Sequence, residues 1–223
     1  LVISASHNLF EDNGIKFFNK DGQKFSSELE KRIETKLTQE MIAVESINLG
    51  KASRMSDAQG RYIEFCKSTF TNLDLKGLSV LLDCANGATY SVAPKVFSEL
   101  GATVNTIGSS PDGININQNC GSTSPENLKE EILKGSYDIG IAFDGDGDRI
   151  LIVSSDGEIL DGDDILYILS KKIKDDSGVV GTLMTNKSLE LHFKENGIKF
   201  ERADVGDKYV LQRLIDKSWQ LGG

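Results

Sequence analysis

The sequence predicts an α/β fold, organised as successive α/β domains with mixed, mainly parallel sheets. Two observations support this prediction. From Leu78 onward, short apolar runs alternate with helical patterns in the order strand, helix, strand, helix, strand. The same alternation then restarts near residue 163. Parallel strands joined by helices require crossover connections, which are expected to be right-handed.

The composition limits the class of protein. The 223 residues are enough for one large domain or two small ones. Because 25 Lys and Arg oppose 34 Asp and Glu, the net charge of −9 argues against nucleic acid or an anionic membrane as a general partner. No apolar run approaches the roughly 20 residues of a membrane span. Three widely spaced cysteines favour reduced thiols and a cytoplasmic location.

The first elements lie in residues 1–70. Residues 1–3 read as the end of a strand, and a polar loop follows to Asn13. Ser27 and Glu30 resemble a capping box. The helix expected after them carries one apolar stripe, made of Leu29, Ile33, Leu37 and Met41. The polar stretch 48–59 contains a plausible domain boundary, and a further helix is expected around Tyr62, Phe65, Cys66 and Phe70.

The middle of the chain shows the clearest alternation. The expected elements are strand 78–83, helix 89–100 ending at Gly101, strand 103–107, a long loop 108–124, a helix beginning at Ser124-Pro125 with Pro in its first turn, and strand 139–143. Residues 150–154 and 158–160 flank the turn Asp156-Gly157 and predict an antiparallel hairpin.

The last part continues the α/β pattern. The expected elements are helix 163–174, strand 179–184, helix 187–196, strand 198–202 and a helix after Asp207. Residues 221–223 read as a turn leading into another element. Because the chain also begins inside an apolar run without Met, we expect an internal portion of a longer protein.

Three acidic residues directly follow the apolar run 139–143. Asp144, Asp146 and Asp148 alternate with glycines, and Arg149 comes behind them. Carboxylates this close repel one another unless a cation lies among them, and glycines let the backbone bend so that alternate side chains converge. Hard oxygen ligands favour Mg²⁺ over zinc or copper. The pattern therefore predicts a Mg²⁺ site at a strand end, where α/β folds place their chemistry.

Two other interpretations of this loop are weaker. An EF-hand would need Gly at the sixth position and Glu at the twelfth, where the chain has Arg149 and Ser155. A solvated acidic turn would not explain the apolar strand that precedes the loop. A metal site remains the favoured interpretation.

A second cluster surrounds Ser6. Ser6 lies beside His7 in the predicted loop, and the turn Asn13-Gly14 could fold Lys16 back toward it. A serine hydroxyl is a poor nucleophile unless a base or a positive field activates it. A phosphoserine would carry roughly −1.5 to −2 charges and would need cations. Taken alone, however, a Ser-His pair in a loop is more often structural, and His192 reads as a surface or packing residue.

Four ordered motifs carry a family resemblance. They are residues 4–8 with 13–16 (SASHN and NGIK), 83–88 (DCANGA), 115–123 (NINQNCGST) and 143–149 (FDGDGDR). Together they resemble the α-D-phosphohexomutase superfamily over essentially the whole chain. Within it, residues 61–66, 181–184 and 205–210 are similar to the bacterial phosphoglucosamine mutases.

The resemblance implies a four-domain protein around a central cleft. Residues 1–55 would be the end of a phosphoserine-bearing first domain, 56–158 a metal-loop second domain and 159–223 the start of a sugar-binding third domain. Residues 1–223 alone would then be inactive. The implied reaction interconverts glucosamine 6-phosphate and glucosamine 1-phosphate through a phosphoserine and a 1,6-bisphosphate, on the route to UDP-N-acetylglucosamine.

The resemblance also implies residue roles. Ser6 matches the phosphorylated serine, whose phosphate would complete a Mg²⁺ site formed by Asp144, Asp146 and Asp148. Lys16 matches a general base, and Arg149 matches the arginine that helps to position the phosphate. His7 flanks the serine, and Gly206 and Asp207 fall in the loop near the sugar. The implied partner is a small sugar phosphate, and a homodimer is a further possibility.

Two positions depart from the family pattern. Leu9 stands where the family usually has Pro, which could loosen the serine loop. Lys208 replaces a common Arg, which keeps the charge but loses the bidentate geometry. The family's sugar-recognition segment would begin just after Gly223, so phosphoglucomutase and phosphomannomutase activities remain open alternatives.

Two functions of other classes also remain open. In a haloacid-dehalogenase-type phosphatase, an apolar strand ends in Asp-x-Asp, and Asp144 would be the nucleophile with Asp146 as the acid. That interpretation leaves the serine cluster unexplained. A binding module for Mg²⁺ or a sugar phosphate that has lost catalysis is the non-enzymatic alternative, and the presence of both Ser6 and Lys16 counts against it.

Overall fold

The first group of elements forms a small hairpin and one helix. The computed structural model describes residues 1–71, 73–173 and 177–223. Strands β1 (Val2–Ser4) and β2 (Gly14–Lys16) pair antiparallel, with the 3-10 helix η1 (Phe10–Asp12) between them. Lys16 lies opposite Val2 in this pairing. The turn predicted at Asn13-Gly14 therefore brings Lys16 back alongside the strand that precedes Ser6.

Helix α1 (Ser27–Leu37) corrects the predicted cap and length. Its N-cap is Ser26, whose hydroxyl accepts a hydrogen bond from the Leu29 N–H at 3.3 Å, so the capping box of Ser27 with Glu30 was wrong. Met41 lies beyond the helix and is exposed. Since α1 buries no residue, packing does not extend it beyond what its local helix propensity supports.

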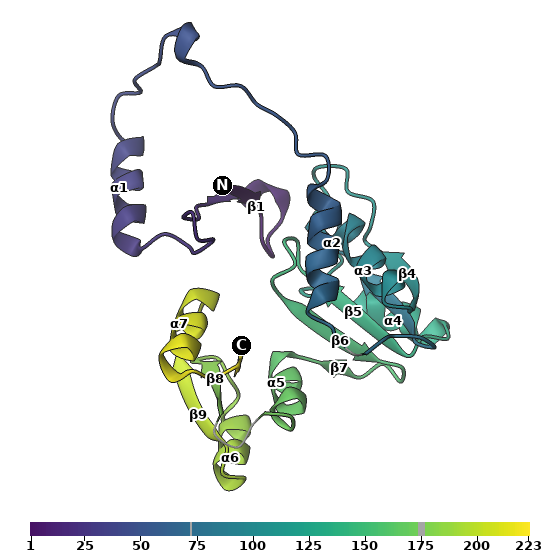
Figure 1. The fold of residues 1–223 in the computed structure, drawn as a ribbon. Coiled ribbons are helices and arrows are strands. Elements are labelled where there is room, and N and C mark those ends of the chain that lie inside the picture. Colours follow the sequence, from purple (N-terminus) through teal and green to yellow (C-terminus); the bar gives the residue numbers. More distant parts are fainter. Residues whose placement is uncertain (72, 174–176) are drawn as a thin grey trace.

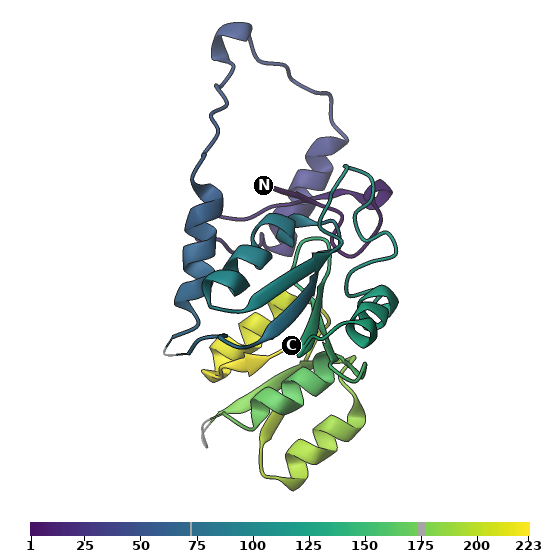
Figure 2. The same ribbon diagram turned by 90° about the vertical axis from the view of Figure 1, so that its right-hand side faces the viewer.

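A long connection separates this group from the second. The 3-10 helix η2 (Ser46–Asn48) lies at the far end of this connection, away from the other elements, and residues 49–57, which contain neither helix nor strand, lead back to them (Figure 2). Helix α2 (Ala58–Ser68) then begins where the aromatic pattern predicts a helix. Its buried residue is Ile63, whereas Tyr62 and Phe65 are exposed.

The second group forms a five-stranded sheet in the order β4-β3-β5-β6-β7 (Figure 1). The elements are β3 (Ser79–Asp83), the 3-10 helix η3 (Ala88–Ser91), α3 (Ala93–Glu99), β4 (Thr103–Ile107), α4 (Glu126–Lys134), β5 (Ile139–Phe143), β6 (Ile150–Ser154) and β7 (Ile159–Leu160). Strands β4, β3 and β5 are parallel, and β6 and β7 add the predicted antiparallel hairpin.

Two helix starts in this sheet domain differ from the prediction. The single helix expected over 89–100 is divided into η3 and α3, because Pro94 lacks the N–H that would continue η3 and instead occupies the first turn of α3. Pro125 is the N-cap of α4 rather than its first helical residue. Both shifts are local and leave the strand ends in place.

Apolar layers cover both faces of the parallel strands. Val80 and Leu82 point to one face and pack with Ala93 of α3, whereas Leu81 points to the other and packs with Leu128 of α4. A strand buried on both faces is typical of parallel sheets. The two layers hold β3 and β5 as neighbours, so the loops that follow these strands emerge side by side.

The third group is a parallel sheet in the order β10-β8-β9. Its elements are α5 (Gly162–Ser170), β8 (Gly178–Thr182), α6 (Lys187–Glu195), β9 (Lys199–Ala203), α7 (Asp207–Lys217) and β10 (Leu221–Gly222). Helix α5 is shorter than the predicted 163–174, and residue 174 lies outside the described residues. Within the described residues, no helix is long and apolar enough to cross a membrane.

The turn expected at residues 221–223 was wrong, because residues 221–222 form strand β10 beside β8. Leu221 packs with the cluster around Phe193, which gives the strand an apolar anchor. Gly222 allows the close approach, since a Cβ there would lie 2.8 Å from Val210 and 2.9 Å from the Val180 carbonyl oxygen. His192 packs edge-on against Tyr167 at 5.0 Å, in line with the packing role expected for it.

The three thiols are free, and we expect them to differ sharply in reactivity. Cys84 and Cys120 are buried, and this burial raises the pKa of each thiol to about 11. At pH 8 only about one such thiol in 1000 is a thiolate, the form that attacks electrophiles. Cys66 is partly exposed. Brief iodoacetamide treatment followed by peptide mass spectrometry should therefore find label on Cys66 alone.

The same labelling in guanidinium should modify all three cysteines, and Cys66→Ser should leave the native protein without a rapidly labelled site among them. Rapid native labelling of Cys84 or Cys120 would contradict the buried positions described above.

Candidate active site

The acidic loop begins directly at the end of β5. Asp144 is fully buried, and its Oδ1 accepts hydrogen bonds from the N–H groups of Gly147 at 3.0 Å and Arg149 at 3.2 Å. These bonds curl the loop around the carboxylate. Gly147 has φ +74°, a left-handed conformation that glycine adopts without strain. Asp144 Oδ2 is buried and has no hydrogen-bond partner among the described residues.

The three carboxylates converge as the sequence predicts. One oxygen from each of Asp144, Asp146 and Asp148 lies within 4.8 Å of the others. Asp146 Oδ2 accepts hydrogen bonds from Ser4 Oγ at 2.9 Å and from Lys16 Nζ, whereas Asp146 Oδ1 is buried without a partner among the described residues. Two unpartnered buried oxygens in an all-oxygen donor set fit a hard divalent cation.

The pKa values of the carboxylates differ in direction. Burial raises the pKa of Asp144, and the negative charges of Asp148 and Asp146 raise it further against the backbone N–H bond and the positive charge of Arg149. Burial also opposes ionisation of Asp146, but hydrogen bonds from Lys16 and Ser4 outweigh it and lower the pKa of Asp146. Burial and, after it, the neighbouring carboxylates therefore disfavour the ionised form of Asp144, and a bound cation would oppose both effects.

Lys16 projects from β2 into this cluster. Its Nζ binds Asp146 and lies 3.6 Å from Asp148 Oδ2. Partial burial disfavours the ammonium, but the hydrogen bond to Asp146 and the charges of the three carboxylates outweigh burial and raise the pKa of Lys16. Lys16 is therefore a firmly protonated cation in this arrangement. It is close enough to act in the site, but as an acid or a fixed charge rather than as a free base.

Ser6 lies in a tight turn against the acidic loop. The Asn8 N–H donates to the Ala5 carbonyl at 2.9 Å, and Ser6 between them has φ +53°. The left-handed conformation is uncommon for a serine and places its side chain at the tip of the turn. Ser4 Oγ accepts from the Ser6 N–H at 2.8 Å, and the Ser6 hydroxyl lies 3.4 Å from Nδ1 of His7.

The serine turn contacts the acidic loop at Gly145. A Cβ at this position would clash with the Ser6 carbonyl oxygen, so only glycine permits the approach. The Gly145 carbonyl accepts from the Ala88 N–H at 2.8 Å, which links the acidic loop to the loop after β3. The structure thus brings the Ser6 turn and Lys16 next to the acidic loop, which lies more than a hundred residues later in the sequence.

Asp83 holds two of the loops around the site together. It was not among the predicted site residues. It ends β3, is fully buried, and accepts from the N–H groups of Ala85 at 3.0 Å and Gly121 at 2.7 Å. Burial raises the pKa of Asp83 against these two bonds. The bond to Ala85 fixes the start of the loop after β3, and the bond to Gly121 ties the end of β3 to the loop after β4. The same signal that identified Asp144, an acidic residue at the end of a buried strand, could have identified Asp83.

A cavity of about 760 Å³ opens in front of this site. Its lining includes Ser6, Lys16 and Arg149 on one side and Gly206 and Asp207 on the other. Arg149 is largely exposed, with its Nε 3.9 Å from Asp148 Oδ1. The loop predicted to lie near a sugar therefore faces the serine and the acidic loop across one hollow.

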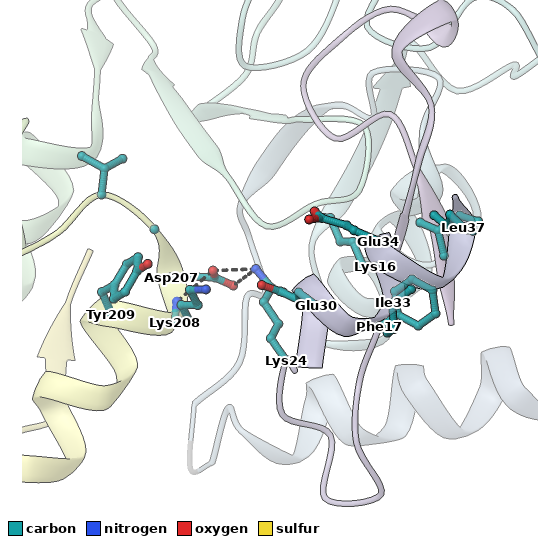
Figure 3. Close-up of a pocket in the computed structure, with 13 residues that line it drawn as sticks. Lys16, Phe17, Lys24, Glu30, Ile33, Glu34, Leu37, Asp207, Lys208 and Tyr209 are labelled. Carbon is teal, nitrogen blue, oxygen red and sulfur yellow. Dashed lines mark hydrogen bonds and ion pairs between the residues drawn. The ribbon is translucent and has the colours of Figure 1, made fainter. Parts of the chain in front are cut away.

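An ion pair joins the first and third groups of elements beside this cavity. Lys24 Nζ lies 2.6 and 2.8 Å from the two carboxylate oxygens of Asp207 (Figure 3). Burial opposes ionisation of Asp207, but the bond from Lys24 prevails and lowers the pKa of Asp207. The Nζ of Lys208 lies 5.1 Å from the Tyr209 ring centroid. Sequence reasoning missed Lys24, because no local pattern distinguishes it from other surface lysines.

Fold and site together define a multidomain α/β protein in which a serine turn packs against an acidic loop whose three carboxylates could hold a metal ion. Family models described as phosphoglucomutase/phosphomannomutase, alpha/beta/alpha domains I, II and III match residues 1–43, 60–157 and 161–223. The chain belongs to the phosphoglucomutase/phosphomannomutase family, within the phosphohexomutase superfamily.

Curated relatives carry a more specific name. Proteins named phosphoglucosamine mutase from Legionella pneumophila (strain Corby) and Pseudomonas entomophila (strain L48) are 55% and 56% identical to the chain over all of its length. The chain spans about half the length of these relatives, 50% and 51%.

Solved structures show the same fold at lower identity. A phosphoglucomutase/phosphomannomutase family protein from Burkholderia thailandensis matches 100% of the chain with 48% of its own length, at 24% identity and a TM-score of 0.71. The open form of a Paramecium phosphoglucomutase matches 97% of the chain with 46% of its own, at 18% identity and a TM-score of 0.64.

Proposed function

We propose that the full-length protein is a phosphoglucosamine mutase, which interconverts glucosamine 6-phosphate and glucosamine 1-phosphate. One structural observation carries the proposal: Lys16 of the first group binds Asp146 of the second group, and the Ser6 turn packs against Gly145 of the same acidic loop. Relatives 55% identical to the chain bear this name. A phosphoserine needs positive charge around it, and this arrangement provides both a lysine and a cation-type site.

The reaction would begin with Ser6 phosphorylated. The O1 hydroxyl of glucosamine 6-phosphate attacks phosphorus, the bond from phosphorus to Ser6 Oγ breaks, and the O1 proton leaves to a base. The resulting 1,6-bisphosphate turns over in the cavity, Ser6 Oγ attacks the phosphorus of its 6-phosphate, and the bond from that phosphorus to O6 breaks. The proton released in the first transfer passes to O6, which leaves glucosamine 1-phosphate and the phosphorylated Ser6. Such transfers are catalysed mainly by positioning and charge stabilisation.

Asp144, Asp146 and Asp148 would hold Mg²⁺, with a phosphoserine oxygen from Ser6 as a further ligand. The ion would supply positive charge next to the phosphoryl oxygens. The two unpartnered buried oxygens of the cluster support this assignment. Binding of a cation would also weaken the hold of the carboxylates on Lys16, whose raised pKa otherwise opposes the role of general base.

The remaining site residues would act around the phosphate and the sugar. Arg149 would position the phosphate from its side of the cavity, and His7 would orient the Ser6 hydroxyl, which lies 3.4 Å from its ring. Gly206 and Asp207 would meet the sugar from the opposite side. The substrate is a small sugar phosphate, and we place the enzyme in the cytoplasm, where free thiols such as Cys84 persist.

The phosphatase alternative fits the geometry less well. An aspartyl nucleophile must reach the substrate, but Asp144 is fully buried and is absent from the lining of the cavity. Ser6 by contrast is partly exposed and lines the cavity. The chemical stability of the phosphoenzyme separates the two, since phosphoserine survives acid and an aspartyl phosphate does not.

The direct test is a mutase assay of the full-length protein with the 1-phosphates of glucosamine, glucose and mannose. We expect kcat/KM to be at least about tenfold higher for glucosamine 1-phosphate, because a site that recognises a polar substituent discriminates against its loss. A preference for glucose or mannose 1-phosphate would transfer the assignment to phosphoglucomutase or phosphomannomutase. Hydrolysis without isomerisation would refute the mutase.

A further inference from the structure

The side chain of Asn117 links the serine turn to the second group of elements. Its Nδ2 donates hydrogen bonds to the carbonyl oxygens of Ser6 at 2.8 Å and Asn8 at 2.7 Å. These two carbonyls flank the tip of the turn. A single amide therefore holds the backbone of the serine turn at two points, the Ser6 carbonyl and the Asn8 carbonyl.

Asn117 is itself held firmly in place. Its side chain and backbone are buried, with 6% exposure, and its own N–H donates to the Ala85 carbonyl at 2.8 Å. Ala85 in turn donates its N–H to Asp83, the buried acid at the end of β3. Through these bonds Asn117, which holds the serine turn, is attached to the sheet that carries the acidic loop.

The amide also fills the corner between the serine turn and the acidic loop. A Cβ at Gly145 would lie 2.7 Å from Asn117 Nδ2 and would clash with the Ser6 carbonyl oxygen. Asn117 Oδ1 is buried without a hydrogen-bond partner among the described residues, and the backbone has φ +57°. Both features disfavour the folded state, so the two Nδ2 bonds are the local interactions that favour asparagine here.

We propose that Asn117 is a positioning residue that holds Ser6 in register with the carboxylate cluster. This inference rests on the proposed mutase function. A loosened turn would let the serine oxygen drift from its transfer position, and misplacement by about 1 Å can cost about 100-fold in rate. Asn117 is absent from the lining of the cavity in front of the site, so its loss should lower kcat and leave KM for the sugar phosphate nearly unchanged.

Two variants of the full-length protein test this inference. Asn117→Asp keeps the shape but replaces the donor by an oxygen, which repels both carbonyls. Asn117→Gly removes the amide and relieves the left-handed backbone, so it is the variant expected to fold best. The matched control is Asn119→Gly, at an exposed asparagine with φ +53° two residues along the loop. Thermal unfolding is measured for all four proteins.

We expect kcat for glucosamine 1-phosphate to fall about 10- to 100-fold in both Asn117 variants, with KM within about twofold, and to be unchanged in Asn119→Gly. Unchanged kcat in the folded Asn117→Gly variant, an equal loss in Asn119→Gly, or a rise in KM alone would overturn the inference. The wild-type arm reports separately on the proposed function: an inactive wild type refutes the mutase, whereas an active wild type with unaffected variants refutes only the role of Asn117.

Discussion

Ser6→Ala in the full-length protein is expected to abolish the phosphoenzyme and to lower mutase turnover by about 1000-fold or more, because no hydroxyl remains to carry the phosphoryl group. The variant should be structurally silent. The contacts that hold the turn use the backbone of Ser6: its N–H donates to Ser4 Oγ, and its carbonyl accepts from Asn117. Alanine retains both.

The measurements are intact-protein mass after incubation with glucose 1,6-bisphosphate, peptide mapping of the phosphate and steady-state turnover. Ser98→Ala is the matched control, since this hydroxyl lies on the exposed face of helix α3 and bonds locally to the Lys95 carbonyl. A phosphorylated Ser6→Ala protein, or one with wild-type turnover, would show that another residue carries the phosphoryl group. An acid-labile phosphate on Asp144 would favour the phosphatase mechanism instead.

Asp144→Asn should separate metal binding from folding. The amide oxygen can still accept the N–H bonds of Gly147 and Arg149, so the loop keeps its shape. The oxygen without a hydrogen-bond partner, Oδ2, becomes an NH₂ group, which cannot bind a cation. We expect loss of divalent-metal binding and a fall in turnover of about 100-fold or more, since charge stabilisation is a main catalytic effect in phosphoryl transfer.

In the absence of metal, Asp144→Asn should stabilise the folded protein, although it lowers activity. Burial and the neighbouring charges of Asp148 and Asp146 raise the pKa of Asp144 above its ordinary value of 3.8. The folded state therefore holds this proton at pH values where the unfolded chain has released it, and the stability contributed by Asp144 falls as pH rises through that window. Removing the charge should therefore raise the free energy of unfolding at pH 7.5 when no metal is bound.

Thermal unfolding in EDTA and in Mg²⁺ checks both statements. At about 100 times its dissociation constant, a ligand stabilises the wild type by about 2.7 kcal/mol, and Asp144→Asn should gain nothing. Asp216→Asn, on the exposed face of α7, is the matched control and should respond to Mg²⁺ as the wild type does. An Asp144→Asn protein stabilised by Mg²⁺ as much as the wild type would exclude this carboxylate as a ligand.

Local patterns predicted the central strands well, because β3 and β5 are apolar runs that α3 and α4 cover. Residues 103–107, 139–143 and 150–154 were predicted as strands and are strands. The misses lie where local signals compete or packing decides. Ser26 and Ser27 are equally good caps by type, and the backbone selected Ser26. Residues 221–222 became a strand only because β8 offers an open edge beside Val179.

By itself, the sequence determined the chemistry available to this protein. Asp144, Asp146 and Asp148 alternate with glycine after a buried strand, so their convergence follows from covalent geometry within one loop. The position of Ser6 in a loop after a strand and the turn at Asn13-Gly14 were also predicted, because turn and strand signals act over a few residues.

Only the tertiary structure decided which of these parts meet. Lys16 forms an ion pair with Asp146, and Lys24 forms one with Asp207. Asn117 donates a hydrogen bond to the Ser6 carbonyl. Each pair is separated by more than a hundred residues, and its contact depends on how whole sheets and loops pack rather than on any local pattern. The proposed function rests on the packing of the serine turn against the acidic loop. This packing is therefore a property of the folded chain.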